Sequence, residues 1–452
     1  MQAKLSRWAL LVSMIVAICS HGTSFAQEMS PNGQYKEGLA VGGWKLFPGI
    51  FVGADYDSNN NQTVSGTDHG EGVSLRVVPR LTGVYDGGIH KTSIYGVVDA
   101  RFFNADTVAA TVGLTHLYEA TRDLYFNFYG NYTRQTDIFR SALQFNNGAI
   151  GPPATPNVNI PIIINPFGNT PGANPIAYNQ FTGGAFVTKK FDQFTLTLNG
   201  TAFGIVYDHP DSVPAPFQTS HDGSSFWGSA RLAYNFTPAF FAFAQGDGIF
   251  QRFDNSVFNT NGYRVIGGVG SNDPNSLFRG EIYGGYWAQN QIVNQDQLFF
   301  DAFSQLNLNA FGIPTDTHTG VFGGRLSYFP TRYWSIVAQV DQTLGMSTTL
   351  APGIPAGIPI KSTTAILQST YGIARDWSVG VRGGYTQGTF IGFGDLNNHG
   401  WMGGASFNYQ IWRNLLLTLD YQYTTTQSRN TVFAPFTEFT DNRVSAGVTY
   451  KY

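Results

Sequence analysis

The 452-residue chain has a single cysteine, Cys19, and few charged residues. Asp, Glu, Lys and Arg make up 12% of the residues, whereas a soluble domain usually carries about 25%. After residue 26 no stretch reaches about 18 consecutive apolar residues, which excludes an ordinary transmembrane helix there. The apolar residues must therefore be kept from water in another way. A closed β-barrel does this, because its backbone groups pair between strands and its outer face meets lipid.

The first 26 residues have the organisation of a secretory signal peptide. Lys4 and Arg7 precede an apolar stretch, residues 8–19, that is too short to span a bilayer, and small residues lead to a cleavage site near Ala26. Ile18 stands where a lipoprotein signal usually has Gly or Ala, which argues against lipid attachment at the following cysteine. Cleavage leaves a chain without disulfides or thiol chemistry. Residues 27–43 are then expected to be a short periplasmic N-terminal arm.

The last twelve residues of the sequence, 441–452, alternate between apolar and polar side chains. Successive side chains of a strand point to opposite faces, so this pattern predicts a strand with one apolar and one polar face. It stops at an aromatic residue, as do the strands that close outer-membrane barrels. We expect it to be the closing strand and the assembly signal. Its apolar residues are Val444, Ala446, Val448, Tyr450 and Tyr452.

The same alternation recurs along residues 44–452. We count eighteen strands, beginning with residues 44–57, or sixteen if the weakly patterned segments 264–270 and 363–373 lose a hairpin. Pro79, inside the second strand, predicts a bulge or an early strand end, because proline lacks the N–H that a ladder needs. The fold class is therefore all-β: a transmembrane, antiparallel, up-and-down β-barrel. With sixteen to eighteen strands it is wide enough for an aqueous lumen.

Short turns and long loops alternate between these strands. The short turns resemble one another, because each places an aromatic or apolar residue on both sides of a tight polar turn, which fits hairpin ends in an aromatic girdle at the membrane interface. We expect these turns to be periplasmic and the long, polar or Pro/Gly-rich connections to be extracellular. The similar turns are residues 118–125, 329–334, 373–377 and 409–415, and the long connections are residues 139–179, 207–223, 289–320 and 347–361.

Residues 42–50 read GGWKLFPGI and residues 54–60 read ADYDSNN. Together they resemble the opening of the second putative beta-barrel porin family, a group of bacterial outer-membrane barrels often linked to exopolysaccharide export. The resemblance extends over nearly the whole chain after the signal peptide. It implies a location in the outer membrane of a Gram-negative bacterium, with membrane lipid and the barrel-assembly machinery as partners. A porin-like channel for small solutes or a secreted polysaccharide is the function it implies.

Most charges of the expected strands fall on the parity that faces the lumen. One interpretation is mutual bracing of same-face neighbours, such as Asp99 with Arg101 or Arg279 with Glu281. The other, compatible with it, is a charged pore lining that selects solutes. Eight arginines against five acids predict a net positive wall and a mild preference for anions. The predicted lining residues are Arg76, Arg80, Asp99, Arg101, Arg231, Asp247, Arg279, Glu281, Arg325, Asp341, Arg382, Asp420 and Arg443.

No catalytic or metal-binding motif stands out in the sequence. Among the histidines after residue 26, only His116 falls well within an expected strand, and no serine accompanies it at a telling spacing. Residues 55–61 begin like a calcium loop, but Asn60 and Gly66 replace the required Gly and bidentate Glu. We predict no enzyme activity, no cofactor, no metal and no nucleic-acid partner. A barrel acting as a lipid-modifying enzyme or as a surface-binding scaffold is the alternative function.

Overall fold

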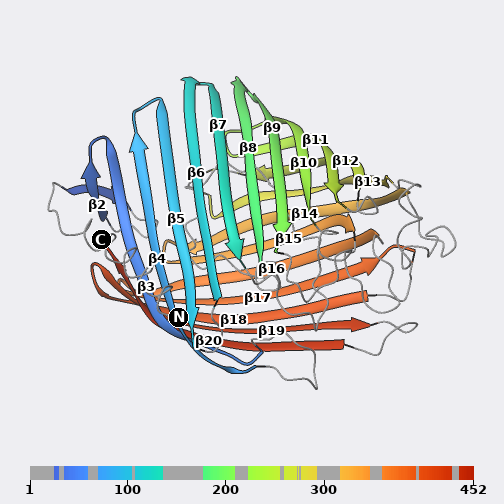
Figure 1. Ribbon diagram of the computed structural model, residues 1–452. Coiled ribbons are helices and arrows are strands. Elements are labelled where there is room, and N and C mark those ends of the chain that lie inside the picture. The colour runs from blue at the N-terminus through green and yellow to red at the C-terminus, as the bar shows by residue number, and fades with distance from the viewer. Residues whose placement is uncertain are drawn as a thin grey trace.

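The computed structural model describes residues 25–29, 35–59, 70–103, 107–135, 177–208, 222–254, 259–271, 273, 276–292, 316–346, 359–392, 397–429 and 437–452. In these residues each strand pairs antiparallel with the next along the chain, and β20 (Thr437–Lys451) pairs with β3 (Trp44–Asp57). The described strands β3 to β20 therefore form one closed barrel of eighteen strands (Figure 1). The predicted all-β barrel is confirmed, and so is the strand count of eighteen.

The strands between β3 and β20 follow one another without a crossover. In Figure 1 the blue-to-green strands and the orange-to-red strands form two walls whose strands cross in the view. The intervening strands are β4 (Gly72–Asp86), β5 (His90–Phe102), β6 (Thr107–Thr121), β7 (Leu124–Gln135), β8 (Tyr178–Phe191), β9 (Phe194–Tyr207), β10 (Gly223–Asn235), β11 (Phe240–Phe253), β12 (Thr260–Ser271), β13 (Phe278–Gln291), β14 (Asp316–Thr331), β15 (Trp334–Met346), β16 (Pro359–Ala374), β17 (Trp377–Phe390), β18 (Asn397–Trp412) and β19 (Leu415–Arg429).

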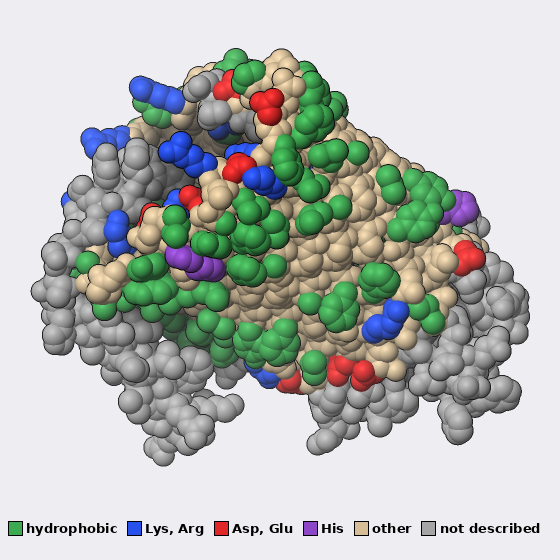
Figure 2. Space-filling view, turned by 90° about the horizontal axis from the view of Figure 1, so that it is seen from above, with side chains coloured by type: hydrophobic (Ala, Val, Ile, Leu, Met, Phe, Trp, Pro, Cys, Tyr) green, Lys and Arg blue, Asp and Glu red, His purple; other side chains and the backbone are tan. Residues whose placement is uncertain are grey.

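The two faces of the barrel wall carry different side chains. Large apolar residues on one parity of the strands are exposed, for example Val73 and Val265, at 59% and 55%. In the closing strand, Val444 and Tyr450 lie on this outer face and are also exposed. Figure 2 shows hydrophobic side chains spread over the outer surface, with charged side chains gathered mainly near its margins. An apolar outer face and a polar inner face are what a lipid-embedded barrel requires.

In the part of the chain that the structure describes, no helix is long and apolar enough to cross a membrane.

Four short turns share a local irregularity. The ladders of β6 with β7, β14 with β15, β16 with β17 and β18 with β19 each shift register immediately before the turn. These are the four turns whose sequences resemble one another. An extra residue on one strand increases the local twist, so the repeated turn sequence corresponds to a repeated bulge at the same end of the barrel.

The weakly patterned segments and Pro79 do not interrupt the barrel. Both segments form strands, β12 and β16, so the sixteen-strand alternative is wrong. Pro79 lies inside β4, where it pairs with Ile50 of β3 without a change of register. On the β5 side, the described pairs step from Val77 to Arg80 and leave out Pro79. The missing N–H therefore costs local pairing on one side only, and the predicted bulge or early strand end does not occur.

Two further strands precede the barrel. β2 (Tyr35–Val41) pairs with β1 (Phe25–Met29) and with the first residues of β3, from Trp44 to Leu46. β20 pairs with β3 only from Gly49 onward, so β2 covers the part of the β3 edge that β20 leaves open. An uncovered edge would present unpaired backbone groups. The expected arm, residues 27–43, thus includes strand structure.

Several sequence-based expectations fall outside the described residues. Residues 1–24 of the expected signal peptide are among them, and so is most of each expected long loop: residues 139–179, 207–223, 289–320 and 347–361.

Candidate functional site: the inner wall of the barrel

The charged residues predicted to line the lumen lie on the parity opposite to the exposed apolar side chains. In β4, Arg76 and Arg80 alternate with the exposed Leu75 and Leu81. In β20, Arg443 precedes the exposed Val444. Because a strand has only two faces, this alternation places the charges on the inner face. The same holds for all thirteen, which come from β4, β5, β10, β11, β13, β14, β15, β17, β19 and β20.

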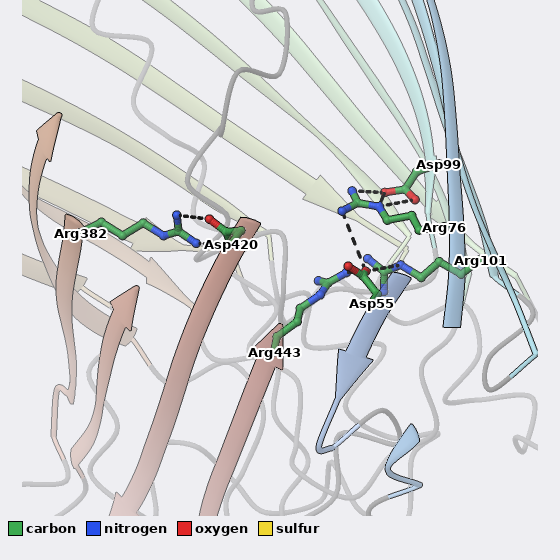
Figure 3. Close-up of polar contacts among 7 residues, drawn as sticks. All are labelled: Asp55, Arg76, Asp99, Arg101, Arg382, Asp420 and Arg443. Carbon is green, nitrogen blue, oxygen red and sulfur yellow. Dashed lines mark hydrogen bonds and ion pairs between the residues drawn. The ribbon is translucent and has the colours of Figure 1, made fainter. Parts of the chain in front are cut away.

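One group of these charges surrounds Asp55 of β3, where the barrel closes. Arg443 donates a hydrogen bond to Asp55 over 2.5 Å, and Arg76 and Arg101 lie 3.9 and 3.5 Å from the same carboxylate oxygen. The side chain of Asp55 is only 2% exposed. Arg76 also donates two hydrogen bonds from Nε and one from Nη2 to Asp99. Figure 3 shows the three arginines converging on Asp55; these five residues are called the Asp55 cluster.

The Asp55 cluster joins the first and last strands of the barrel. Asp55 lies on β3 and Arg443 on β20, while Arg76 and Asp99 extend the group to β4 and β5. The ladder pairs Arg443 with Asp57, and the direct bond to Asp55 runs diagonally to the next inward residue. Breaking a buried charge network by removing one partner costs about 3–5 kcal/mol, because the remaining charges are left uncompensated. Asp55 is the shared partner of this network.

A second pair lies apart from the Asp55 cluster, on β17 and β19 (Figure 3). Arg382 donates two hydrogen bonds to Asp420, at 2.8 and 2.7 Å, in the bidentate arrangement that suits a guanidinium and a carboxylate. Arg382 also reaches Gln422, which pairs with Arg443 in the neighbouring ladder. Gln422 therefore links the Arg382–Asp420 pair to Arg443 of the Asp55 cluster.

A third group is centred on Arg264 of β12 and is buried. Arg264 donates from Nε to Asp247 over 2.7 Å and lies between Trp227 and Trp287, with its Cζ 5.2 and 5.4 Å from their ring centroids. Trp227 and Gln245 also donate to Asp247. Such a packed, hydrogen-bonded group stiffens the wall of β10 to β13 and leaves its charges neutralised.

Two further inward acids each have a close partner on another strand, and Asp341 also has one on its own strand β15. Glu281 accepts hydrogen bonds from Arg231 at 2.6 and 3.2 Å, and Arg231 also lies over the ring of Phe243. Asp341 accepts hydrogen bonds from Tyr283 and Gln339, each at 2.7 Å. The inward charges therefore brace one another across strands. The sequence had suggested same-strand neighbours, whereas the close contacts of Asp99 and Glu281 run to Arg76 and Arg231.

Two inward arginines differ from the rest. Arg80 and Arg325 form no hydrogen bond or ion pair with the described residues, and Arg325 is exposed. Arg279 lies over the ring of Phe329, with its Cζ 4.7 Å from the ring centroid. Within the described residues, the inner wall thus combines paired charges with two arginines, Arg80 and Arg325, that have no carboxylate partner.

Large inward aromatic side chains lie along the wall over glycines of the neighbouring strand. The three atoms nearest to a Cβ added to Gly113 all belong to Tyr95, its partner in the ladder. Phe243 lies over Gly268, 2.7 Å from such a Cβ, which would also meet the backbone oxygen of Ile282 at 2.3 Å. Tyr129 reaches across β8 and bonds Thr201 of β9 over 2.6 Å. Because the missing side chain leaves room on the wall, these rings need not project toward the barrel axis.

Within the described ranges, neither the calcium-like stretch, residues 55–61, nor a larger group of acidic and histidine side chains offers a metal site. Asp55 is surrounded by three guanidinium groups, which excludes it as a ligand of a calcium ion. Among the described residues, no group of three or more His, Cys, Asp or Glu side chains could hold a metal. The described histidines contact Thr92, Tyr118, Phe128, Tyr286 and Gln427.

Sequence reasoning missed two central residues, Asp55 and Arg264. Asp55 was read only as part of a calcium-like loop, although the parity of its strand already points it inward. Arg264 falls in the weakly patterned segment, where three of the next six residues are glycine. The outward Val265 beside it would have placed it on the inner face.

Comparisons with known proteins find one matching family model and several similar solved structures. A family model described as "Putative beta-barrel porin 2" matches residues 165–310. No curated protein matches the chain. Similar solved structures include OpdL of Pseudomonas aeruginosa, with 12% identity, 91% of this chain and 99% of that chain covered and a TM-score of 0.44. OccAB4 of Acinetobacter baumannii has 10% identity, 94% and 100% coverage and a TM-score of 0.42. Neither structure is close enough to assign a cargo.

Proposed function

We propose that this chain, a porin-like outer-membrane β-barrel that resembles the Putative beta-barrel porin 2 family, is a passive channel for small hydrophilic solutes with a mild preference for anions. The observation that carries the proposal is the excess of positive charge on the inner wall. It is concentrated where arginines outnumber acids, in the Asp55 cluster and at Arg80 and Arg325.

Pairing reduces the charge that a solute would meet. The pairs Arg382–Asp420, Arg231–Glu281 and Arg264–Asp247 each bring one cation and one anion together. The Asp55 cluster holds three arginines and two acids, and Arg80 and Arg325 add two more cations. Asp341, which bonds the neutral Tyr283 and Gln339, offsets one of these positive charges. Fixed positive charge beside an aqueous path raises the local concentration of anions, and salt screens this effect beyond about 10 Å at 0.1 M.

The placement of the aromatic side chains supports a water-filled path. Tyr95 and Phe243 lie over glycines of the wall, and Tyr129 extends along it to Thr201. Bulky inward residues on eighteen strands would otherwise take up much of the cross-section. An eighteen-stranded barrel is within the range that leaves an aqueous channel.

The test is the ion selectivity of single barrels in a planar bilayer under a potassium chloride gradient. We expect a reversal potential of anion-selective sign that weakens as salt rises. The double variant Arg80→Gln with Arg325→Gln should lower the selectivity. The control Arg252→Gln, an arginine on the outer parity of β11 that bonds Asn261, should leave it unchanged.

A reversal potential of cation-selective sign in the unmodified protein would refute the argument that the inner wall is positively charged. Absence of conductance by protein shown to be folded and inserted would refute the open channel.

A secreted polysaccharide is the second candidate cargo. The observation that favours it is the set of half-buried aromatic rings lying along the inner wall, including Phe51, Tyr95 and Tyr129, because sugar rings stack on aromatic faces. Neutral oligosaccharides added to the bilayer chamber should then interrupt the current, and Tyr95→Ala should shorten the interruptions. Oligosaccharides that leave the current of the open channel unchanged would restrict the cargo to small solutes.

The proposal also includes the cellular location of the protein and its partner in assembly. Residues 1–26 direct the chain across the inner membrane and are then removed. In the periplasm, the barrel-assembly machinery recognises the closing strand and inserts the barrel. N-terminal sequencing of the protein from outer membranes would test the cleavage near Ala26. A mature protein that retains Met1 would rule the cleavage out.

A further inference from the structure

Two histidines meet on the outer face of β5 and β6, close to the turn of residues 87–89. His90 Nδ1 and His116 Nε2 are 3.4 Å apart. His90 is exposed at the first position of β5, and His116 is half-buried. They lie on the same parity as the exposed Ile94 and Leu114, so both rings are outside the barrel. We propose that they form a two-histidine site for a divalent transition-metal ion such as Zn²⁺, Cu²⁺ or Ni²⁺.

The separation of the two nitrogen atoms suits a shared ion. A tetrahedral Zn²⁺ with ligand distances of about 2.0–2.1 Å holds two nitrogen atoms about 3.3–3.4 Å apart. The observed separation is long for a direct hydrogen bond between two rings. One ion can therefore bind between them with little movement of either side chain, and water completes its coordination.

Both imidazole rings are held in place by neighbours. Thr92 Oγ1 lies 2.8 Å from Nδ1 of His116, so a proton on Nδ1 can be donated to the hydroxyl while Nε2 presents its lone pair to the ion. His90 stacks on Tyr118, with ring centroids 4.8 Å apart and planes 11° apart. A group that orients the second nitrogen of a metal-binding histidine commonly strengthens binding 10–100-fold.

The chemistry of the pair selects the class of ion. Neutral imidazole suits Zn²⁺, Cu²⁺ and Ni²⁺, whereas Mg²⁺ and Ca²⁺ prefer oxygen ligands. The bound ion would join two adjacent strands at the end of the barrel where the short turns lie. It lies on the outer face of β5 and β6, whereas the proposed channel is lined by the inner face, so the proposal does not depend on the channel.

The site can be tested on the full barrel folded in detergent micelles. Zn²⁺ titrated by calorimetry should bind with a stoichiometry of one at this site, and Cu²⁺ should give an electron paramagnetic resonance signal with two nitrogen ligands. His90→Gln and His116→Gln should each weaken binding at least tenfold, and Thr92→Val should weaken it less. The matched control is His318→Gln, because His318 is an exposed outer-face histidine that stacks on Tyr286.

Equal affinity in the unmodified protein and both histidine variants would overturn the site. A copper signal with one nitrogen ligand would do the same. A heat-shifted band on gels shows that each variant is folded. Because His90 is exposed, His90→Gln should disturb folding less than His116→Gln or Thr92→Val.

Discussion

At the scale of single residues, the inner wall depends on a few buried groups that serve several partners. Asp55 is the clearest case, because three arginines from three strands share its carboxylate. Most exposed ion pairs contribute little, since water screens them and long side chains lose freedom. Burial reverses this balance once the pair is formed, because removing one partner leaves the other desolvated.

Replacing Asp55 with Asn should therefore destabilise the barrel by about 3–5 kcal/mol, because three inward arginines lose their shared counter-charge. The measurement is denaturant-induced unfolding of the barrel in detergent. The control is Asp208→Asn, since Asp208 pairs with Arg134 where both side chains are over 40% exposed. That change should cost less than about 1 kcal/mol. Similar losses in the two variants would contradict a structural role for the Asp55 cluster.

A second residue-scale prediction concerns Tyr95. Gly113→Ala should push the Tyr95 ring off the wall toward the lumen, because the three atoms nearest to the added Cβ all belong to the Tyr95 side chain. Single-channel conductance should fall, while the folded fraction stays near that of the unmodified protein. The control is Gly96→Ala on β5, where an added Cβ meets nothing within 4 Å. An unchanged conductance in Gly113→Ala would mean that Tyr95 does not border the conducting path.

At the scale of elements, closure is the decisive step. β20 pairs with β19 along its length and with β3 from Arg443 to Lys451. β2 then covers the beginning of β3, where β20 has ended. The barrel therefore depends on its last strand in two ladders at once. The end of β20 lies beside the turn between β18 and β19, because the N–H of Lys451 donates to the carbonyl of Asn414.

Deleting residues 448–452 should abolish assembly. The deletion removes the pairs of Val448, Thr449 and Tyr450 with β3 and leaves backbone groups unpaired in lipid, at a cost of several kcal/mol each. We expect loss of the heat-modifiable band on gels and degradation in the periplasm. Lys451→Gln, which keeps every backbone pair, should assemble normally. A truncated protein that accumulates in folded form would show that closure does not need these residues.

At the scale of the whole molecule, the short turns gather at one end of the barrel and the longer connections at the other. The connection between β7 and β8 contains prolines at seven positions from 152 to 175, a composition that predicts a surface loop. In the proposed orientation this connection faces the outside of the cell.

Protease added to intact cells should therefore cleave within residues 139–179, whereas the tight turn at residues 121–123 should be protected. Immunoblots of the fragments would locate the cut. The matched control is the same treatment after the outer membrane has been breached, which should expose the periplasmic turns as well. Cleavage that appears only after the breach would reverse the orientation.

The sequence alone determined the class of the fold and the favoured strand count, and it predicted a face for each strand side chain from its parity. These follow from local rules: period-two alternation sets the face of each side chain, and tight polar turns set where strands end. The four similar turn sequences correspond to four similar bulges for the same local reason. Pro79 was misjudged because its cost depends on which neighbouring strand needs its N–H, and that requires the ladder on both sides.

Only the tertiary structure decided which inward residues touch. Asp55 and Arg443 are 388 positions apart and meet only because the barrel closes with one particular register. The sequence suggested no metal site, yet His90 and His116 come together once β5 and β6 are aligned. The fit of Tyr95 over Gly113 also depends on that alignment. The sequence of a strand determines which of its side chains share a face. The stagger between strands determines which side chains of different strands become neighbours.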